Sequence, residues 1–281
     1  MFKIKNKKIG DKNKTFIIAE VGLSHEGSLG LAKYFVDLST KGGADAIKFQ
    51  MHYPEAESSK LEKFRVKFSS QDKSRYDYWE RTSFTLNQWK ELSNYCKKRK
   101  IIFLCSPFSI KAVHYLNKLA VPAWKIASGE FNNKLLYKNI SLLSKKLLIL
   151  STGLSDMKEI NEITKYLKKN KQIFSILQCT SEYPTKITRV GHNLIKNLKK
   201  KFKVPIGISD HTGNINSIIS SIAMGANIIE FHVVIDRNFF GPDSKSSITF
   251  DELKLITNFN KDFFEINKSK IKKKRTKKIS Q

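Results

Sequence analysis

The sequence lacks any apolar run that approaches the roughly 20 residues needed to span a bilayer. Its charged N-terminus, MFKIKNKKIGDKNK, is not followed by the apolar core of a signal peptide. Cysteine is scarce too, with three residues and no CxxC spacing, which argues against a disulfide framework or a zinc knuckle. These absences predict a soluble cytoplasmic protein whose cysteines are buried and reduced, namely Cys96, Cys105 and Cys179.

Acidic residues are few: 25 Asp and Glu stand against 52 Lys and Arg, and the formal net charge is +27. The excess is mostly lysine scattered among Asn and Ile, without an arginine–aromatic stripe of the kind that binds nucleic acid. One dense cluster, Lys268 to Lys278, holds eight basic residues and no acid. We therefore expect no specific nucleic-acid partner and an attraction of anionic substrates. A tail that contacts nucleic acid or an anionic membrane is the weaker alternative.

Short apolar runs alternate with amphipathic segments along most of the chain. The runs predicted as strands are Thr15–Val21, Ala46–Gln50, Ile101–Cys105, Ala123–Ala127, Leu147–Leu150, Ile173–Cys179, Val204–Ser209 and Asn227–His232. The helices predicted to follow them lie near Leu29–Lys41, Leu86–Arg99, Ile110–Leu119, Asn133–Ser144, Ser155–Lys169, Val190–Phe202, Ile215–Met224 and Asp251–Ile266. Near-continuous apolar strands are typical of a parallel sheet covered by helices. Eight such units in about 250 residues predict an α/β fold, a (β/α)8 TIM barrel.

A doubly wound open sheet is the alternative fold, but the turn EVGLSHEG after the first run lacks the GxGxxG spacing usual there. The barrel is expected over residues 15–266, after a polar leader at 1–14 and before a basic tail at 267–281. A polar insertion at about 51–85, called the aromatic insertion below, carries FRVKFSSQDKSRYDYW and fits no unit. Loops this long are usually functional or disordered, and its aromatics favour an ordered lid or wall over the site.

Polar side chains gather at the carboxyl ends of the predicted strands, where a barrel has its active site. They are Glu20, Lys48, Gln50, Ser106, Lys125, Ser128, Ser151, Thr152, Thr180–Tyr183, Ser209–His211 and His232. Lys48 and Lys125 lie inside apolar runs, and burying an ammonium is costly unless an anion faces it. With hydroxyls beside them, they predict a clamp for a phosphorylated or carboxylated substrate. The alternatives are buried ion pairs with Glu20 and Glu130, and a Schiff-base lysine.

Two histidines lie at the ends of the last two predicted strands: His211 just past the seventh, and His232 at the last residue of the eighth. Neighbouring strands would bring them together across the top of the barrel. A two-histidine site completed by a carboxylate, a substrate oxygen and water suits Mn²⁺, Fe²⁺ or Zn²⁺, and oxygen-rich surroundings favour Mn²⁺ or Mg²⁺. A structural role is the alternative. Among the other histidines, only His25 and His52 follow strand ends and could approach the site.

The ordered motifs resemble those of the N-acetylneuraminate (sialic acid) synthase family, with its legionaminic and pseudaminic acid relatives. They are IIAEVGLSHEGSLGLAK, GGADAIKFQ, FLCSPFS, VPAWKIASGE, ILSTGLSDMKEI, LQCTSEYP, GISDHT, IIEFH and GPDSKSS, over about residues 15–265. The resemblance implies a (β/α)8 barrel that condenses phosphoenolpyruvate with an N-acetylated aldose, such as N-acetylmannosamine. With water, the products would be a nine-carbon 2-keto acid and phosphate.

The resemblance also implies roles for single residues. Phosphoenolpyruvate would be held by Lys48, Ser106, Lys125, Ser128, Ser151 and Ser209. A divalent metal, typically Mn²⁺ with Mg²⁺ or Co²⁺ as alternatives, would be held by His211 and His232, and Glu20 would position sugar or water and relay a proton. The sugar side would be lined by Gln50, Tyr183 and Asp243. Tyr183 as a packed loop aromatic and Asp243 as a turn residue are the structural alternatives.

Typical family members continue into a small antifreeze-like domain that reaches over a partner subunit and contributes an arginine to the sugar site. This sequence ends in KSKIKKKRTKKISQ and is expected to lack that domain. The resemblance therefore implies a homodimer, or a separately encoded antifreeze-like domain as partner. A non-catalytic barrel that binds phosphoenolpyruvate or a sugar, as a sensor or as one subunit of an assembly, is the alternative to the synthase.

Overall fold

The computed structural model describes residues 2–64 and 68–269. Its parallel ring of strands comprises β3 (Phe16–Gly22), β4 (Ala46–Met51), β5 (Ile102–Pro107), β6 (Trp124–Ile126), β7 (Leu148–Ser151), β8 (Phe174–Cys179), β9 (Ile206–Asp210) and β10 (Ile228–Val234). The hydrogen-bonded order is β5-β4-β3-β10-β9-β8-β7-β6, and contacts between β5 and β6 bring its two ends together. The predicted (β/α)8 barrel is confirmed, and the strand ends differ from the predicted ones by no more than two residues.

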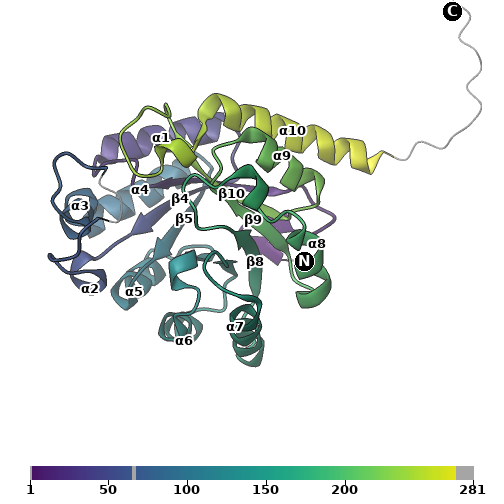
Figure 1. Ribbon diagram of the computed structural model, residues 1–281, viewed down its shortest axis with the longest axis horizontal. Coiled ribbons are helices and arrows are strands. Elements are labelled where there is room, and N and C mark those ends of the chain that lie inside the picture. Colours follow the sequence, from purple (N-terminus) through teal and green to yellow (C-terminus); the bar gives the residue numbers. More distant parts are fainter. Residues whose placement is uncertain (1, 65–67, 270–281) are drawn as a thin grey trace, which may run out of the picture.

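A helix follows each strand of the ring and covers its outer face (Figure 1). These helices are α1 (Leu29–Lys41), α4 (Leu86–Lys98), α5 (Ile110–Lys118), α6 (Lys134–Leu143), α7 (Met157–Lys169), α8 (Leu194–Phe202), α9 (Ile215–Ala223) and α10 (Phe250–Lys268). Their apolar residues recur at helical spacing, as Ile160, Ile163 and Leu167 do in α7, and these side chains are buried in the main core. Helix α8 begins later than the predicted Val190, because Gly191 has a φ of +79°, which a helix does not allow; a 3-10 turn, η2 (Ile187–Arg189), lies before it.

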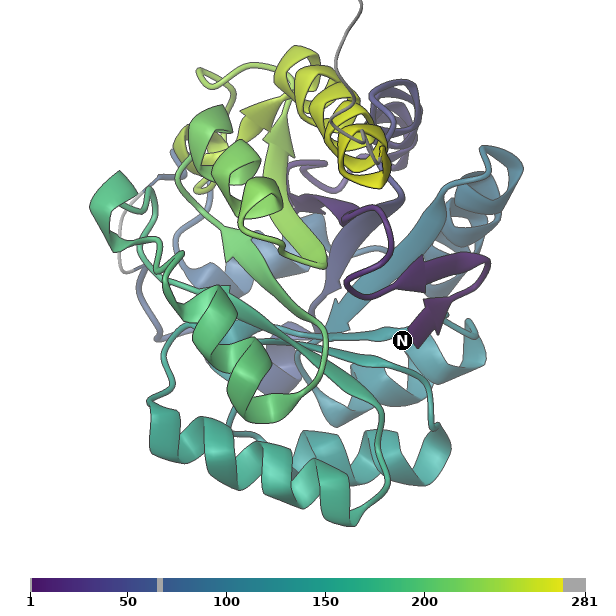
Figure 2. The same cartoon turned by 90° about the vertical axis from the view of Figure 1, so that its right-hand side faces the viewer.

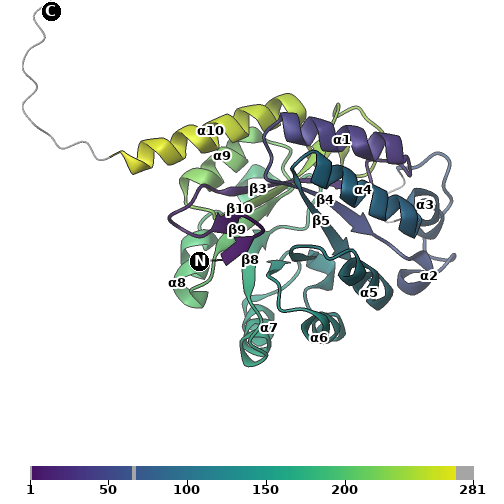
Figure 3. The same cartoon turned by 180° about the vertical axis from the view of Figure 1, so that it is seen from behind.

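The N-terminal segment is not only the polar leader that the sequence predicts. Strands β1 (Phe2–Ile4) and β2 (Lys7–Ile9) form an antiparallel hairpin. Ile4 and Ile9 are fully buried against residues at the amino ends of the ring strands, such as Phe16 and Ala46. The hairpin lies across that end of the barrel, dark purple in Figures 2 and 3. It therefore closes the barrel opposite the expected active site.

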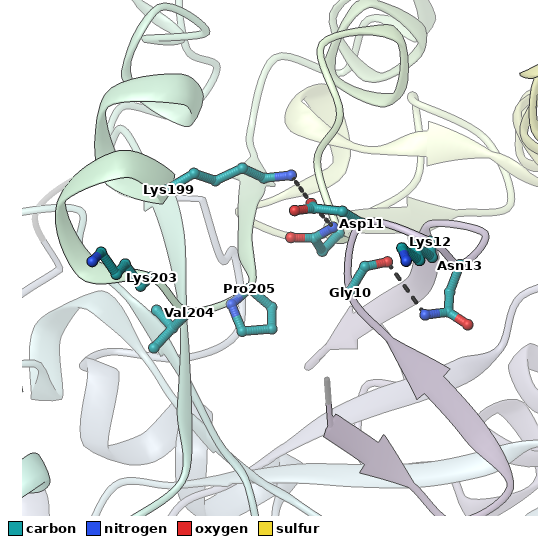
Figure 4. A pocket seen from close by; sticks show the side chains of 9 residues that line it. Gly10, Asp11, Lys12, Asn13, Lys199, Lys203, Val204 and Pro205 are labelled. Carbon is teal, nitrogen blue, oxygen red and sulfur yellow. Dashed lines mark hydrogen bonds and ion pairs between the residues drawn. The ribbon is translucent and has the colours of Figure 1, made fainter.

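A pocket of about 300 Å³ opens beside this hairpin, between the loop after β2 and the end of α8 (Figure 4). Lys199 pairs there with Asp11 and donates to the carbonyl of Gly225 at 2.6 Å. The pocket lies at the amino ends of the strands, so it is separate from the polar strand ends described below.

The aromatic insertion is folded in its described residues. It contains α2 (Pro54–Glu57) and α3 (Arg75–Thr82), while Met51 belongs to β4 and residues 65–67 lie outside the described part. Phe68 packs edge-on against Tyr78 at 4.9 Å and against Phe240 at 6.2 Å, measured between ring centroids. Phe240 lies in the loop after β10, so the insertion reaches across to the far side of the site. This loop also contains η3 (Ser244–Ser246) and leads to β11 (Ile248–Thr249), which pairs with β10.

The remaining predictions concern the cysteines and the tail. Cys96, Cys105 and Cys179 are buried and unpaired, as predicted. Across residues 2–64 and 68–269, no helix has the length and apolarity that crossing a membrane requires. The predicted basic tail lies outside the described residues from residue 270 onward.

Candidate active site

Four charged side chains are buried together at the centre of the barrel. Lys48 Nζ on β4 lies 2.7 Å from Glu20 Oε2 on β3, and Lys125 Nζ on β6 lies 3.1 Å from Glu230 Oε1 on β10. Lys48 is also 4.0 Å from Glu230. The alternative of buried ion pairs is therefore right for Lys48 with Glu20, but Glu130 is wrong as the partner of Lys125. Glu130 instead accepts a hydrogen bond from the side chain of the nearby Asn133.

The two lysines differ in electrostatic environment. Burial disfavours both ammonium groups, but Glu20 and Glu230 together outweigh it at Lys48 and raise its pKa. At Lys125 burial prevails, aided by the charge of Lys48, and the pKa is lowered in spite of Glu230. Burial also raises the pKa of Glu230, but the two lysines outweigh it and the pKa is lowered. Lys48 is thus the more firmly charged of the two cations.

Serine hydroxyls surround the lysines, as the sequence predicts from the strand ends. Lys48 donates to Ser106 Oγ at 3.1 Å, and Lys125 donates to Ser151 Oγ at 2.9 Å. Because each serine oxygen accepts a lysine proton, its own O–H is left to donate to another group. Ser209 Oγ, on β9, donates to Glu230 at 3.4 Å. Three strand-end hydroxyls therefore lie beside two ammonium groups, which is a set of donors suited to an anion.

The fourth predicted serine, Ser128, lies in η1 (Ser128–Glu130) just after β6. Its hydroxyl accepts a hydrogen bond from Ser181 at 3.0 Å, a residue that the sequence marks only as part of the polar run Thr180–Tyr183. Gly153 packs against both serines: a Cβ placed on it would lie 2.3 Å from Ser181 Oγ and 2.4 Å from Ser128 Cβ. The two hydroxyls can approach each other because residue 153 has no side chain.

The two candidate metal ligands lie side by side, with ring centroids 5.5 Å apart. His211 Nδ1 lies 3.1 Å from the carbonyl of Thr180 and donates to it, so Nε2 is the unprotonated nitrogen and accepts from Tyr183 Oη at 3.1 Å. His232 Nδ1 is buried without a hydrogen bond and lies 3.7 Å from Asp243 Oδ2. His232 is not the last residue of its strand, because β10 continues to Val234.

These two imidazoles fit a divalent cation. Burial first, and then the neighbouring His232, lower the pKa of His211 to about 3, so its ring is neutral as metal binding requires. A carbonyl that holds Nδ1–H fixes the ring and directs Nε2 outward, which is the usual support of a histidine ligand. No group of three or more His, Cys, Asp and Glu is placed to hold a metal within residues 2–64 and 68–269. A cation on this pair would therefore need oxygen ligands from substrate and water.

Two of the three side chains predicted for the sugar side, Gln50 and Asp243, meet around Gly22, which has a φ of +58° at the end of β3. A Cβ on Gly22 would lie 3.5 Å from Asp243 Oδ2, 3.5 Å from His232 Cε1 and 3.6 Å from Gln50 Nε2. Gln50 in turn donates to Glu20 Oε1 at 2.8 Å. The structure thus brings Gln50 and Asp243 to His232, while the half-exposed Tyr183 contacts His211.

The aromatic insertion is anchored to the loop after β3. Arg81 in α3 bonds Asp72 within the insertion and Glu26 outside it, both at 2.8 Å. Burial raises the pKa of the Tyr78 phenol well above its usual range, and the phenol donates to Glu26 at 3.1 Å. His25, one of two histidines expected to approach the site, stacks on Phe84 at 4.4 Å instead. The insertion is therefore held as a wall beside the site.

Comparisons of the sequence and the fold with known proteins identify the family of this chain. The model of the NeuB family matches residues 35–272. The chain is 38% identical over 249 residues to N,N'-diacetyllegionaminic acid synthase of Campylobacter jejuni, covering 86% of this chain and 74% of that protein. It is 31% identical over 250 residues to human N-acetylneuraminate-9-phosphate synthase, covering 87% and 69%.

A crystal structure of the N-acetylneuraminic acid synthetase from Leptospira borgpetersenii, in complex with citrate, superposes with a TM-score of 0.86 at 30% identity. The match covers 98% of this chain and 93% of that chain. Fold and sequence thus lead to the same relatives, and the family resemblance predicted from the motifs is confirmed. The chain belongs to the NeuB family.

Proposed function

We propose that this barrel condenses phosphoenolpyruvate with an N-acetylated aldose, such as N-acetylmannosamine, and releases phosphate and a nine-carbon 2-keto acid. Membership of the NeuB family supports this proposal, as do the relatives named as synthases of legionaminic, pseudaminic and neuraminic acids. The observation that carries it is the buried cluster in which Lys48 and Lys125 each donate to a strand-end serine.

Phosphoenolpyruvate would be bound by this cluster. Lys48, Lys125, Ser106, Ser151, Ser209 and Ser128 would donate to its phosphate and carboxylate oxygens. Each lysine has three N–H donors, and in this structure Lys48 uses its protons on Glu20 and Ser106. Lys48 thus keeps one donor for the substrate without breaking its ion pair. Lys125 already donates to Glu230, to Ser151 and, at 3.4 Å, to the carbonyl of Ile126, and it would give up this last, long bond to the substrate. Retaining the pairs also keeps the lysines in place before the substrate arrives.

The sugar would enter on the side of the histidine pair, where Gln50, Tyr183 and Asp243 would contact its hydroxyl and acetamido groups. His211 and His232 would hold a divalent cation, Mn²⁺ by preference and Mg²⁺ or Co²⁺ otherwise. When bound there, the cation would supply Lewis acidity to the aldehyde oxygen of the open-chain sugar. The wall formed by the aromatic insertion would limit the access of water to this side.

The reaction balances as one condensation and one hydrolysis. The C3 carbon of phosphoenolpyruvate forms a bond to the aldehyde carbon, and the aldehyde oxygen takes a proton to become a hydroxyl. Water adds at C2, and the C2–O bond to phosphate breaks as the ketone forms. Glu20, whose Oε2 lies 2.7 Å from Lys48 Nζ, would accept a proton from that water. Lys125 would donate to the departing phosphate.

The test is phosphate release by the purified protein with Mn²⁺, phosphoenolpyruvate and a panel of N-acetylated hexosamines. We expect release that depends on one sugar and stops when the metal is chelated. The same assay, with and without a separately supplied antifreeze-like domain, examines that predicted partner, and sizing the protein examines the homodimer. Ligand-induced thermal stabilisation without turnover of any sugar would overturn the synthase and favour a binding-only barrel.

A further inference from the structure

His52 lies just after β4, between the barrel and the aromatic insertion. Its side chain is buried, with its ring stacked between Trp79 of α3 at 4.4 Å and Phe108 after β5 at 4.2 Å. Its two ring nitrogens contact groups on opposite sides: Nδ1 lies 2.6 Å from Glu57 Oε2, and Nε2 lies 3.1 Å from Gln50 Oε1. His52 thus connects the insertion to a residue of the proposed sugar side.

The orientation of the Gln50 amide is fixed by its other neighbour. Glu20 is a carboxylate because its Oε2 lies 2.7 Å from the Lys48 ammonium. The Gln50 atom 2.8 Å from Glu20 Oε1 must therefore be the NH₂ nitrogen, since two unprotonated oxygens would repel each other at that distance. The amide oxygen then faces His52, and an oxygen can only accept. His52 Nε2 consequently carries a proton and donates it to Gln50.

The other nitrogen must also donate. Glu57 accepts the backbone N–H of Tyr53 at 2.7 Å through Oε1 and faces His52 Nδ1 through Oε2. With Glu57 as a carboxylate, which offers only acceptors, Nδ1 carries a proton as well. Both ring nitrogens are then protonated, and His52 is an imidazolium. Stacking between two aromatic rings stabilises such a cation when it is shielded from water.

Some of the other charged groups near the His52 ring favour its protonated form, and others oppose it. Glu130 of η1 is close enough for His52 to influence its carboxyl electrostatically, and it adds negative charge beside Glu57. His25 interacts with His52 as a second positive group when both are charged. Arg75 stacks on the Trp79 ring with its guanidinium carbon 4.7 Å from the centroid. Direct contact with Glu57 at 2.6 Å is the closest of these interactions and decides the charge of the ring.

We propose that His52 is held as an imidazolium by Glu57 and that it positions Gln50, keeping the Gln50 amide directed at Glu20 and at the sugar. Glu57 belongs to α2 and Trp79 to α3, so the aromatic insertion would determine the geometry of a side chain at the carboxyl end of β4. The charge of His52 is inferred from its contacts with Gln50 and an ionised Glu57, whereas its effect on the sugar rests on the proposed function.

The charge is tested by long-range ¹H–¹⁵N correlation spectra of the full chain at neutral pH, with the His52 signals assigned through His52→Gln. We expect both ring nitrogens of His52 to resonate as protonated nitrogens. A spectrum in which one ring nitrogen of His52 is unprotonated would overturn the proposal. This measurement is made on the wild-type protein, and the variant serves only to assign the signals. Glu57→Gln should convert the ring to the neutral form.

Positioning is tested with Glu57→Gln against Glu55→Gln as the matched control. Both glutamates lie in α2, but Glu55 is exposed and pairs with Lys111 at the surface. In Glu57→Gln we expect the side-chain amide protons of Gln50 to exchange faster with water, and the KM for the sugar to rise about tenfold, as for loss of one hydrogen bond to a charged group. The KM for phosphoenolpyruvate and the values for Glu55→Gln should be unchanged.

The outcomes separate the two proposals. If the wild-type protein turns over no sugar, the proposed function fails, while the nitrogen spectra and the Gln50 exchange still decide the role of His52. If turnover is normal but Glu57→Gln alters neither Gln50 exchange nor the sugar KM, the positioning role is wrong and the synthase stands. Thermal melting of both variants shows whether either result comes from unfolding.

Discussion

Lys125 Nζ lies 3.1 Å from Glu230 Oε1, and both side chains are buried in the middle of the barrel. Breaking such a pair by removing one partner leaves an uncompensated buried charge, which costs roughly 3–5 kcal/mol. We therefore predict that Glu230→Gln lowers the free energy of unfolding by about this amount, measured by denaturant titration, and abolishes phosphate release.

A double substitution separates charge from packing at this pair. Lys125→Met combined with Glu230→Leu removes both charges and should recover most of the lost stability, because apolar replacements of a buried pair are often neutral or stabilising. It should not recover activity, since Lys125 is proposed to bind phosphoenolpyruvate. Stability of Glu230→Gln equal to that of the wild type would show that this ion pair does not hold the barrel centre together.

A second prediction concerns Gly153, which packs against Ser128 of the proposed phosphoenolpyruvate site. A methyl group there would lie 2.4 Å from Ser128 Cβ and 2.3 Å from Ser181 Oγ, closer than nonbonded atoms allow, so Ser128 must move. Gly153→Ala should raise the KM for phosphoenolpyruvate about tenfold, the loss expected for one hydrogen bond to a charged group. Gly129→Ala is the control, because no atom lies within 4 Å of its Cβ position. Equal KM values for the two variants would contradict a role of Ser128 in binding.

Much of the site was predictable because parallel strands all end at one edge of the barrel. Lys48, Lys125 and the strand-end serines were marked by a simple signal, a polar residue in or after an apolar run. Glu230 carries the same signal within IIEFH, but the partner expected for Lys125 was the loop residue Glu130. A lone acid inside an apolar run, read with the two lysines, would have identified the pair.

The parts that the sequence did not predict depend on contacts distant in the chain. The run FKI and the run KKI are too short and too rich in lysine to show strand periodicity, and only burial against the barrel makes Ile4 and Ile9 core residues. In the aromatic insertion, α3 is held by Arg81 and Tyr78 bonding Glu26, which lies more than 50 residues earlier. Local patterns contain no information about such pairs.

The hairpin yields a prediction about stability. Ile9 is fully buried, so Ile9→Ala removes apolar contacts and leaves a cavity, at a cost of about 2–5 kcal/mol. Lys8→Ala, on the same strand but exposed, should change the free energy of unfolding by less than about 0.5 kcal/mol. Because the hairpin lies at the opposite end from the site, the KM values of folded Ile9→Ala should match the wild type. Equal unfolding free energies for the two variants would show that the hairpin is not part of the cooperative core.

His25 makes stability depend on pH. Burial, and then the charge of His52, lower the pKa of His25 to about 3, and Nδ1 accepts the backbone N–H of Gly27 at 3.2 Å, while Nε2 is buried without a partner. In the unfolded chain a histidine has a pKa of about 6.5. Between these values the unfolded chain binds the extra proton. The His25 contribution to stability is therefore full above pH 6.5 and falls as the pH drops toward 3, by up to about 1.4 kcal/mol per pH unit.

The variant His25→Asn isolates this contribution. An asparagine oxygen can accept the Gly27 N–H in place of Nδ1, but it does not titrate. Denaturant titrations of both proteins across this pH range should give curves that run parallel above about pH 6.5 and converge as the pH falls, because only the wild type loses stability through this group. Parallel curves throughout the range would mean that His25 accepts a proton in the folded protein as readily as in the unfolded chain, contrary to its burial against Phe84.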